Sequence, residues 1–329
     1  MKLAFFDTKP YDIPGFDRYA VPAGIEVKYF EPNLNEDTVS LAAGFDAVCV
    51  FVNDTVNAAV VDKLYQLGIK VIVLRCAGFN NVDIRACRDK LRVFRVPAYS
   101  PHAVAEHAMA LLLTINRRTH KAYIRTREFN FSLQGLAGFD LYGKTVGIIG
   151  TGKIGRVFAD ICRGFGMNIL AYDKFPAADS GLHYVALSEL FEKSDIISLH
   201  CPLTEDTNHL IDAESIARMK KGVTIINTSR GGLINTEDLI TGIKEKKVGA
   251  ACLDVYEEEG DLFYEDFSGH IVQDDKLVRL IAMPNVIVTS HQAFLTTEAL
   301  DNIASTTVTN LVKFFSGSPD GATEVVYNK

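Results

Sequence analysis

Eleven short apolar runs, rich in β-branched residues, recur along the chain and are separated by stretches long enough to form helices. Continuous apolar runs, unlike alternating ones, are typical of parallel strands that are buried on both faces of a sheet. Five of the runs lie within the first 100 residues: Leu3–Phe6, Val27–Phe30, Ala47–Val52, Val71–Leu74 and Val93–Val96. They predict a small doubly wound α/β domain of about five strands.

Two prolines interrupt this series. Pro97 and Pro101 bracket three residues that cannot continue a helix, so we interpret this segment as an extended crossing between two domains. Ser100 is a candidate N-cap, and Pro101 is a favourable first residue for a helix that reaches about Thr119.

The other six runs follow that helix and predict a second, larger α/β domain of roughly six parallel strands. They are Thr145–Ile149, Ile169–Tyr172, Ile196–Leu199, Val223–Asn227, Gly249–Leu253 and Val286–Thr289. A final helix, about Thr297–Ser316, is long enough to carry the chain back to the first domain.

The strand at 145–149 runs directly into a glycine turn, Gly150-Thr151-Gly152-Lys153-Ile154-Gly155, and a helix is expected from Ile154 to Arg163. The three glycines would permit a tight turn, a close approach of the backbone to a pyrophosphate, and close packing of helix on strand. The free N–H groups of a helix N-terminus favour phosphates. Asp173 ends the next strand, where an acid binds a ribose 2′-hydroxyl and repels the phosphate of NADP. The pattern therefore predicts NAD, although Lys174 beside Asp173 weakens the preference over NADP slightly.

Polar residues follow three of the later strands, at the sheet edge where ligands bind in open α/β folds. Arg230 follows residues 223–227 and could hold a carboxylate by two hydrogen bonds, although a surface ion pair is about equally expected from its position. Asp254 and the acidic run 257–259 follow the next strand, and acidic runs are usually solvated surface. His291 ends the last strand and could move a proton near neutral pH. His200 also ends a strand, so position alone does not exclude it.

Composition excludes several other classes of protein. The formal net charge of −7 argues against a nucleic-acid surface, and the longest apolar run contains Glu106 and His107, so no membrane span is expected. An acid at Asp7 comes too early for a signal peptide. The six cysteines show no CxxC pair and no metal-ligand spacing, which predicts buried, reduced thiols in a cytoplasmic protein and no metal site.

Taken together, these residues resemble the family of D-isomer specific 2-hydroxyacid dehydrogenases over nearly the whole chain, and within it the fermentative D-lactate dehydrogenases. The segments that carry the resemblance are Arg75–Asp83, Tyr142–Thr145 leading into the glycine turn, Asn227–Gly232 and His291–Phe294. The resemblance implies a flavodoxin-like substrate domain, residues 1–100 plus 297–329, with an NAD-binding Rossmann domain, residues 101–296, inserted in it. It also implies a homodimer, or a tetramer, formed through the cofactor domain.

The resemblance further implies residue roles in reversible hydride transfer between NADH and pyruvate. Arg230 would bind the substrate carboxylate, His291 would be the acid/base, and Glu259 would be its partner, leaving Glu257 and Glu258 as bystanders. Asp254 would be a cofactor-side residue that also influences the histidine. Further cofactor contacts are expected from Cys201, Pro202, Thr207, Thr228 and Ser229, and Gly78 and Tyr99 would line the substrate pocket.

Two alternatives stay open. Gln292 and Phe294 stand where some relatives have threonine or tyrosine, so the substrate could be a longer or phosphorylated 2-oxo acid. The long phosphoglycerate enzymes carry a regulatory domain, and none is expected after residue 329. A different class is an NAD-sensing corepressor, a binding protein that shares the fold and similar catalytic residues.

Overall fold

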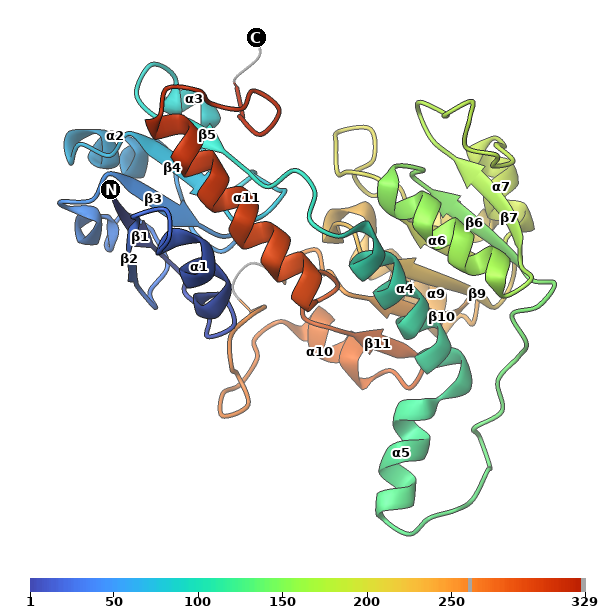
Figure 1. Cartoon of the computed structure of the whole chain (residues 1–329). Coiled ribbons are helices and arrows are strands. Elements are labelled where there is room, and N and C mark those ends of the chain that lie inside the picture. The colour runs from blue at the N-terminus through green and yellow to red at the C-terminus, as the bar shows by residue number, and fades with distance from the viewer. Residues whose placement is uncertain (260–261, 327–329) are drawn as a thin grey trace. The chain divides into compact units, whose positions relative to one another are not determined.

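The computed structural model describes residues 1–259 and 262–326, which form two α/β units (Figure 1). The first unit comprises Met1–Ser100 and Phe294–Lys329, and the second comprises Pro101–Ala293. Two parallel-sheet α/β domains are thus confirmed as the fold. The predicted second boundary, between residues 296 and 297, lies three residues beyond this division, and the roles assigned to the two domains stay predictions.

The first unit is built on a five-stranded parallel sheet in the order β2-β1-β3-β4-β5. This is the flavodoxin-like order, and it agrees with the five predicted strands. The strands are β1 (Lys2–Phe5), β2 (Glu26–Tyr29), β3 (Ala47–Val50), β4 (Val71–Leu74) and β5 (Arg92–Phe94). The helical elements are α1 (Ile13–Ala20), η1 (Val39–Ala42), α2 (Ala58–Gln66), α3 (Ile84–Cys87) and α11 (Thr297–Phe315). Every residue of β3 and β4 is buried, which explains why their runs are apolar without alternation.

The returning helix α11 packs on α1, next to the first sheet (Figure 1). Thr296 caps it by accepting a hydrogen bond from the N–H of Ala299. Asp301 of α11 accepts hydrogen bonds from Arg18 and from the hydroxyl of Tyr19, both on α1. These contacts attach α11 to α1, about 280 positions away in the sequence.

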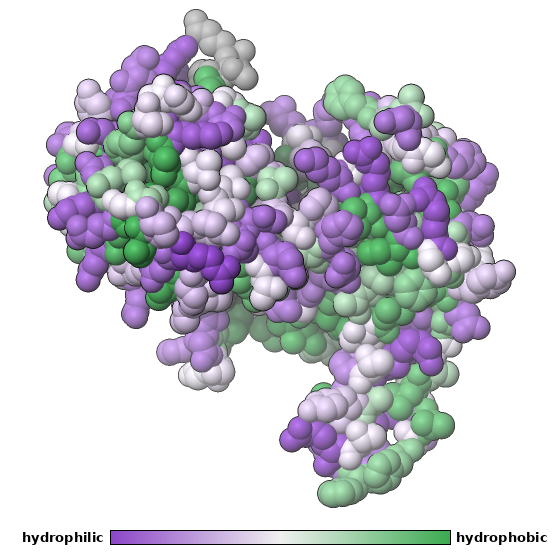
Figure 2. All heavy atoms as spheres, in the orientation of Figure 1, coloured by the Kyte–Doolittle hydropathy of each residue, from purple (hydrophilic) through white to green (hydrophobic). Residues whose placement is uncertain are grey.

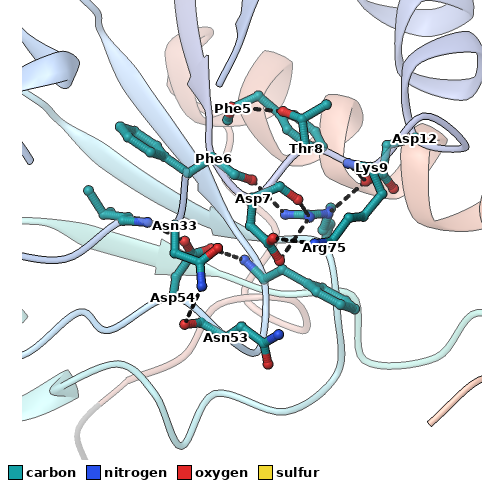
Figure 3. A network of polar contacts seen from close by, with 12 residues as sticks. Phe5, Phe6, Asp7, Thr8, Lys9, Asp12, Asn33, Asn53, Asp54 and Arg75 are labelled. Carbon is teal, nitrogen blue, oxygen red and sulfur yellow. Dashed lines mark hydrogen bonds and ion pairs between the residues drawn. The ribbon is translucent and has the colours of Figure 1, made fainter. Parts of the chain in front are cut away.

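A buried ion network lies at the carboxyl ends of β1 and β4 (Figure 3). Arg75 follows β4, and its side chain is 2% exposed. Its guanidinium donates to the carbonyl oxygens of Phe6 and Asp7 and lies within 3.7 Å of the carboxylates of Asp7 and Asp12. The charge is therefore compensated on several sides, as a buried arginine requires.

The second unit is built on a six-stranded parallel sheet in the order β11-β10-β9-β8-β6-β7. The strands are β6 (Thr145–Ile149), β7 (Asn168–Tyr172), β8 (Ile196–Leu199), β9 (Val223–Asn227), β10 (Val248–Leu253) and β11 (Val286–Val288). A parallel bridge between Ala171 and Tyr184 continues the sheet beyond β7. With this bridge the strands follow the Rossmann order, in which successive strands are added on one side of β6 as far as the bridge and then on its other side, starting with β8.

Helices cover both faces of the second sheet (Figure 1). The covering helices are α4 (Pro101–Arg117), α6 (Lys153–Gly164), α7 (Leu187–Lys193), α8 (Ala213–Arg218), α9 (Thr236–Lys244) and α10 (Asp275–Ala282), with a short η2 (Gly231–Leu233). Helix α5 (Thr119–Arg127) follows α4 and has no buried residue. The core on one face joins α4 and α6 to side chains such as Ile148 and Cys252. The opposite core joins α7, α8, α9 and α10 to side chains such as Ile225 and Leu253.

The predicted helix after residue 100 ends at Arg117, and a separate helix, α5, begins at Thr119. Arg118 between them has a left-handed backbone with φ +50°, which breaks the helix. None of the described helices is long and apolar enough to cross a membrane.

Candidate active site

The glycine turn lies between β6 and α6, and each of its glycines meets a different spatial constraint. Gly150 has φ +93°, and a Cβ there would lie 2.5 Å from the backbone nitrogen of Cys201. A Cβ at Gly155 would lie 2.0 Å from the carbonyl oxygen of Gly150. Around Gly152, by contrast, no described atom beyond its chain neighbours lies within 4 Å of the position of a Cβ. The chain therefore leaves open space at the N-terminus of α6, where Lys153 and Ile154 begin the helix.

The open space suits a pyrophosphate because the first turn of α6 has no side-chain cap among the described residues. Its N–H groups remain free to donate, and the helix dipole favours an anion. The residues therefore fit the diphosphate of a dinucleotide. That Gly152, Lys153 and Ile154 contact the cofactor stays a prediction.

Asp173 follows β7 and faces the glycine turn. Its Oδ2 accepts the N–H of Thr151 at 2.6 Å, and its Oδ1 accepts the N–H of Phe175 at 2.9 Å. Burial by itself raises the pKa of Asp173, but these backbone hydrogen bonds outweigh it and hold the pKa below its usual value. Lys174 turns to Asp206, with its Nζ 2.5 Å from the carboxylate. The charge of Lys174, which weakened the expected preference for NAD over NADP, is thus neutralised by the carboxylate of Asp206.

The residues predicted to contact the cofactor after β8 and β9 are joined by hydrogen bonds. Ser229 donates its hydroxyl to the carbonyl oxygen of Cys201 at 2.6 Å. Thr207 donates to the carbonyl oxygen of Pro202 at 2.7 Å, which closes the loop after β8. The hydroxyl of Thr228 is buried and has no hydrogen-bond partner in the part of the chain that the structure describes. An unpartnered buried hydroxyl suits a ligand that supplies the missing bond.

The three strands that precede the predicted catalytic residues are neighbours in the sheet, and their ends are aligned. Leu253 at the end of β10 pairs with Asn227 of β9 and with Val288 of β11. Neighbouring strands lie about 4.8 Å apart. Arg230 lies three residues after the end of β9, and His291 lies three residues after the end of β11. Both residues therefore lie at the same edge of the sheet, on either side of β10.

Arg230 begins the turn into η2, and Gly231 allows that turn to approach the loop after β10. A Cβ at Gly231 would lie 1.9 Å from the carbonyl oxygen of Tyr256, so only glycine fits. The side-chain amide of Asn227 donates to the carbonyl oxygen of Arg230 at 2.8 Å and fixes its backbone. The guanidinium of Arg230 makes one hydrogen bond, to the carbonyl oxygen of Ser229, and no ion pair with a described carboxylate. A structural ion pair thus does not explain this arginine.

His291 and Glu259 form an ion pair between the loops after β11 and β10. Nδ1 of His291 lies 3.0 Å from Oε1 of Glu259, and the other carboxylate oxygen accepts the N–H of Tyr256 at 2.9 Å. A carboxylate can only accept, so Nδ1 carries a proton. Nε2 has no hydrogen-bond partner among the described residues and is left to exchange a proton with a ligand. The ring is partly exposed and stacks beside Tyr264, whose hydroxyl donates to the carbonyl oxygen of His291.

Asp254 is fully buried and binds the turn that carries His291. Its carboxylate accepts the N–H groups of Gln292 and Ala293 at 2.9 and 2.8 Å and the hydroxyl of Thr289 at 2.6 Å. Burial alone raises the pKa of Asp254, but hydrogen bonds, the first of them from His107, hold the pKa below its usual value. These contacts give the Asp254 carboxylate a structural role within the protein. The expected contact between Asp254 and the cofactor stays a prediction.

The sequence patterns did not indicate two histidines that bind carboxylates at this edge of the sheet. His107 contacts Asp254, and His209 pairs with Glu257, its Nε2 being 2.6 Å from Oε1. The other oxygen of Glu257 accepts the N–H of Thr236 at the start of α9. The expectation that the acidic run is mainly solvated surface is therefore wrong for Glu257. No sequence pattern pairs these residues, because they lie 48 positions apart or more.

His200, which position alone did not exclude, packs into the second unit. Its Nε2 lies 2.9 Å from the hydroxyl of Ser198, and its ring lies against Phe158. Burial lowers the pKa of His200 to about 4, so it is neutral at neutral pH. It is a structural residue by its contacts, and this favours His291 as the proton donor.

The two residues predicted to line the substrate pocket belong to the first unit. Gly78 follows β4, and its carbonyl oxygen accepts from Sγ of Cys76 at 3.3 Å. Tyr99 accepts a hydrogen bond from Asn302 of α11 with its carbonyl oxygen, and its ring lies edge-on to Phe294. The contact of either residue with a substrate stays a prediction.

Comparison with known proteins places the chain among dehydrogenases. The model of the family described as D-isomer specific 2-hydroxyacid dehydrogenase, NAD binding domain, matches residues 109–293. D-lactate dehydrogenase of Escherichia coli strain K12 is 50% identical over 96% of this chain and 98% of its own. A solved pyruvate reductase of Chlamydomonas reinhardtii is 43% identical, with a TM-score of 0.93 over 98% of each chain. A D-lactate dehydrogenase of Lactobacillus jensenii, solved with NAD+, is 30% identical, with a TM-score of 0.83 over 100% of each chain.

Proposed function

We propose that this chain, which belongs to the D-isomer specific 2-hydroxyacid dehydrogenase family and contains its NAD-binding domain, is an NAD-dependent D-lactate dehydrogenase. The reaction is the reversible reduction of pyruvate by NADH, which yields D-lactate and NAD+. One observation carries the proposal. An ion-paired histidine, His291, and an arginine without a described carboxylate partner, Arg230, leave the aligned ends of strands on either side of β10.

In this reaction NADH, when bound, supplies the hydride that C2 of pyruvate accepts. Arg230 holds the substrate carboxylate by two parallel hydrogen bonds, which fixes the orientation of C2. His291 gives the proton on Nε2 to the ketone oxygen, so that the alcohol forms without a free alkoxide. Glu259 stabilises the protonated imidazole by its opposite charge and keeps the ring oriented through Nδ1. In the reverse direction His291 accepts the hydroxyl proton of D-lactate.

Cofactor binding follows from the residues around the glycine turn. We propose that the N-terminus of α6 binds the pyrophosphate and that Asp173 binds the ribose hydroxyls of NAD. The unpartnered hydroxyl of Thr228 and the hydrogen-bonded loop of Cys201, Pro202, Thr207 and Ser229 complete the proposed cofactor site. We propose that Asp254 also contacts the cofactor, besides holding the turn that carries His291. Gly78 and Tyr99 of the first unit line the substrate pocket.

Two further properties belong to the same proposal. Helix α5 and the loop to residue 142 project from the second unit and carry exposed apolar side chains (Figures 1 and 2), with Phe129 and Leu133 being 83% and 82% exposed. Such a patch suits an interface, and we propose a homodimer formed there. All six cysteines are buried free thiols, and we propose on that ground that the protein works in the reducing cytoplasm.

The test is NADH oxidation, followed by absorbance, with pyruvate, 2-oxoisocaproate and 3-phosphohydroxypyruvate as substrates. We expect pyruvate to be turned over fastest and the product to be D-lactate, as measured with an enantiomer-specific assay. Faster reduction of a longer or phosphorylated acid would transfer the assignment to another 2-hydroxyacid dehydrogenase. If NADH binds but no acid is reduced, the chain is an NAD-sensing binding protein instead.

A further inference from the structure

His107 lies on α4, close to the start of the second unit, and its side chain is 18% exposed. Its Nε2 is 3.2 Å from Oδ1 of Asp254 and 3.2 Å from the hydroxyl oxygen of Thr289. Asp254 follows β10 and Thr289 follows β11. The imidazole therefore joins the first long helix of the unit to the ends of the two strands that precede the active-site loops.

The donors and acceptors in this contact can be assigned. The Asp254 carboxylate only accepts hydrogen bonds, and its lowered pKa keeps it ionised at neutral pH. Thr289 donates its hydroxyl hydrogen to Oδ1 of Asp254 and keeps lone pairs with which to accept. Nε2 of His107 consequently carries a proton and shares it between the two oxygens. This is a charge-assisted hydrogen bond to a buried group, which is among the stronger kinds in proteins.

Asp254, whose carboxylate His107 contacts, also holds the backbone at the proton donor and at the two residues after it. Asp254 accepts the N–H groups of Gln292 and Ala293 with its side chain, and its carbonyl oxygen accepts the N–H of His291 at 2.7 Å. His291 has φ +53°, a left-handed conformation that costs a non-glycine residue about 1 kcal/mol or more. The turn keeps this conformation because the carboxylate fixes the next two amides.

We propose that His107 is a positioning residue for proton transfer. By binding Asp254 and Thr289 it orients the carboxylate that holds residues 291–293, and it thereby directs Nε2 of His291 toward the substrate. The inference rests on the proposed role of His291. Without the imidazole, a buried carboxylate loses one of four donors and can rotate, and the left-handed turn loses its fixed support.

The test compares two substitutions that differ in one hydrogen bond. His107→Gln places an amide N–H near the position of Nε2, and His107→Phe keeps a ring but removes the donor. We expect His107→Phe to lower kcat for pyruvate reduction about tenfold, the effect of about 1.4 kcal/mol, while the Kd of NADH changes less than about twofold. His107→Gln should keep most of the activity. His102→Phe, at an exposed histidine of the same helix, is the matched control and should behave as the wild type.

A second measurement does not depend on turnover. Amide hydrogen exchange at Gln292 and Ala293 should become about tenfold faster in His107→Phe and stay slow in His107→Gln. Equal loss of kcat in both variants, or unchanged exchange at the two amides, would overturn the proposal. If the wild type does not reduce pyruvate, the proposed function fails, and the exchange experiment still decides the role of His107. Should His107→Phe not fold, Thr289→Val removes the shared hydroxyl at nearly constant volume and should accelerate the same exchange.

Discussion

Glu259 holds Nδ1 of His291 at 3.0 Å with one carboxylate oxygen, while its other oxygen accepts the N–H of Tyr256 at 2.9 Å. The carboxylate of Glu259 is thus held by a backbone N–H of its own loop in addition to its contact with the imidazole. A carboxylate fixed at this distance orients the imidazole through Nδ1 and leaves the opposite nitrogen, Nε2, to a ligand.

Glu259→Gln should therefore lower the turnover of pyruvate. The amide still accepts the hydrogen bond from Nδ1 but places no charge opposite the ring that donates the proton. We expect kcat at pH 7 to decrease about tenfold while the Kd of NADH stays within about twofold. Steady-state kinetics and NADH titrations of wild type and variant measure this. An unchanged kcat would mean that another group supports His291.

Arg230→Lys should weaken the binding of pyruvate and lower turnover together. Lysine keeps the positive charge but cannot make two parallel hydrogen bonds to a carboxylate. The loss of one charged hydrogen bond is about 2 kcal/mol, so kcat/KM should fall roughly 30-fold. Arg218→Lys, on the exposed face of α8, is the control and should leave the kinetics unchanged. Pyruvate kinetics equal to those of the wild type in Arg230→Lys would remove this residue from the carboxylate site.

Asp173→Asn should reduce the preference for NADH over NADPH. The carboxylate is ionised and lies beside the glycine turn, so its charge repels a 2′-phosphate. We expect the ratio of kcat/KM for the two cofactors to fall about tenfold or more, the effect of about 1.4 kcal/mol. Asp206→Asn should act in the same direction but less strongly, because it releases Lys174. A constant ratio in Asp173→Asn would assign the discrimination to other residues.

Local sequence patterns predict where the strands lie and which residues follow their ends, because both depend on residues that are close together in the chain. Residues 145–149 and 223–227 form strands with the predicted bounds, since buried parallel strands require continuous apolar residues. The same reasoning places Arg230 and His291 at strand ends, because a parallel sheet aligns those ends on one edge.

Contacts between distant elements could not be predicted in this way. His107 lies inside a helical pattern, and nothing near it in the sequence indicates that its face meets Asp254, 147 positions later. His209 has φ +53°, and its backbone N–H donates to Gly232, a tertiary constraint that turns its ring toward Glu257. The first long helix of the second unit ends within two residues of its predicted end, but the separate helix α5 that follows Arg118 was not predicted.

Glu257→Gln should alter stability toward acid. Burial alone raises the pKa of Glu257, but the hydrogen bond from His209 and those from Thr236 hold it below its usual value. A lowered folded-state pKa stabilises the protein above the unfolded value, about 4.3, and that stabilisation is lost as pH falls through the folded pKa. The variant should be about 1 kcal/mol less stable at pH 7, and the difference should shrink below pH 4. Glu258→Gln, at an exposed neighbour, is the matched control in urea unfolding. A difference that stays constant with pH would contradict the pairing.

Asp54→Asn should change stability with the opposite dependence on pH. The carboxylate of Asp54 is buried in the first unit and accepts the N–H groups of Leu34 and Phe51, and burial raises its pKa to about 7 (Figure 3). The folded protein then holds this proton more tightly than the unfolded chain, in which the pKa is about 3.9. The wild type should therefore lose stability relative to the variant as pH rises from about 4 to 7 and change no further above that range.

The chain has no tryptophan, so urea unfolding of wild type and Asp54→Asn is followed by circular dichroism at several pH values. The carboxyl group of Asp54 has two oxygens that can accept a hydrogen bond and the amide of Asn has one, so the variant has one backbone N–H unsatisfied and is less stable at pH 4. With rising pH the two free energies of unfolding should converge, because the wild type has to ionise a buried group and the variant does not. Asp37→Asn, at an exposed acid of the same unit, should stay parallel to the wild type throughout. Parallel curves for Asp54→Asn as well would mean that Arg75 compensates the buried charge fully.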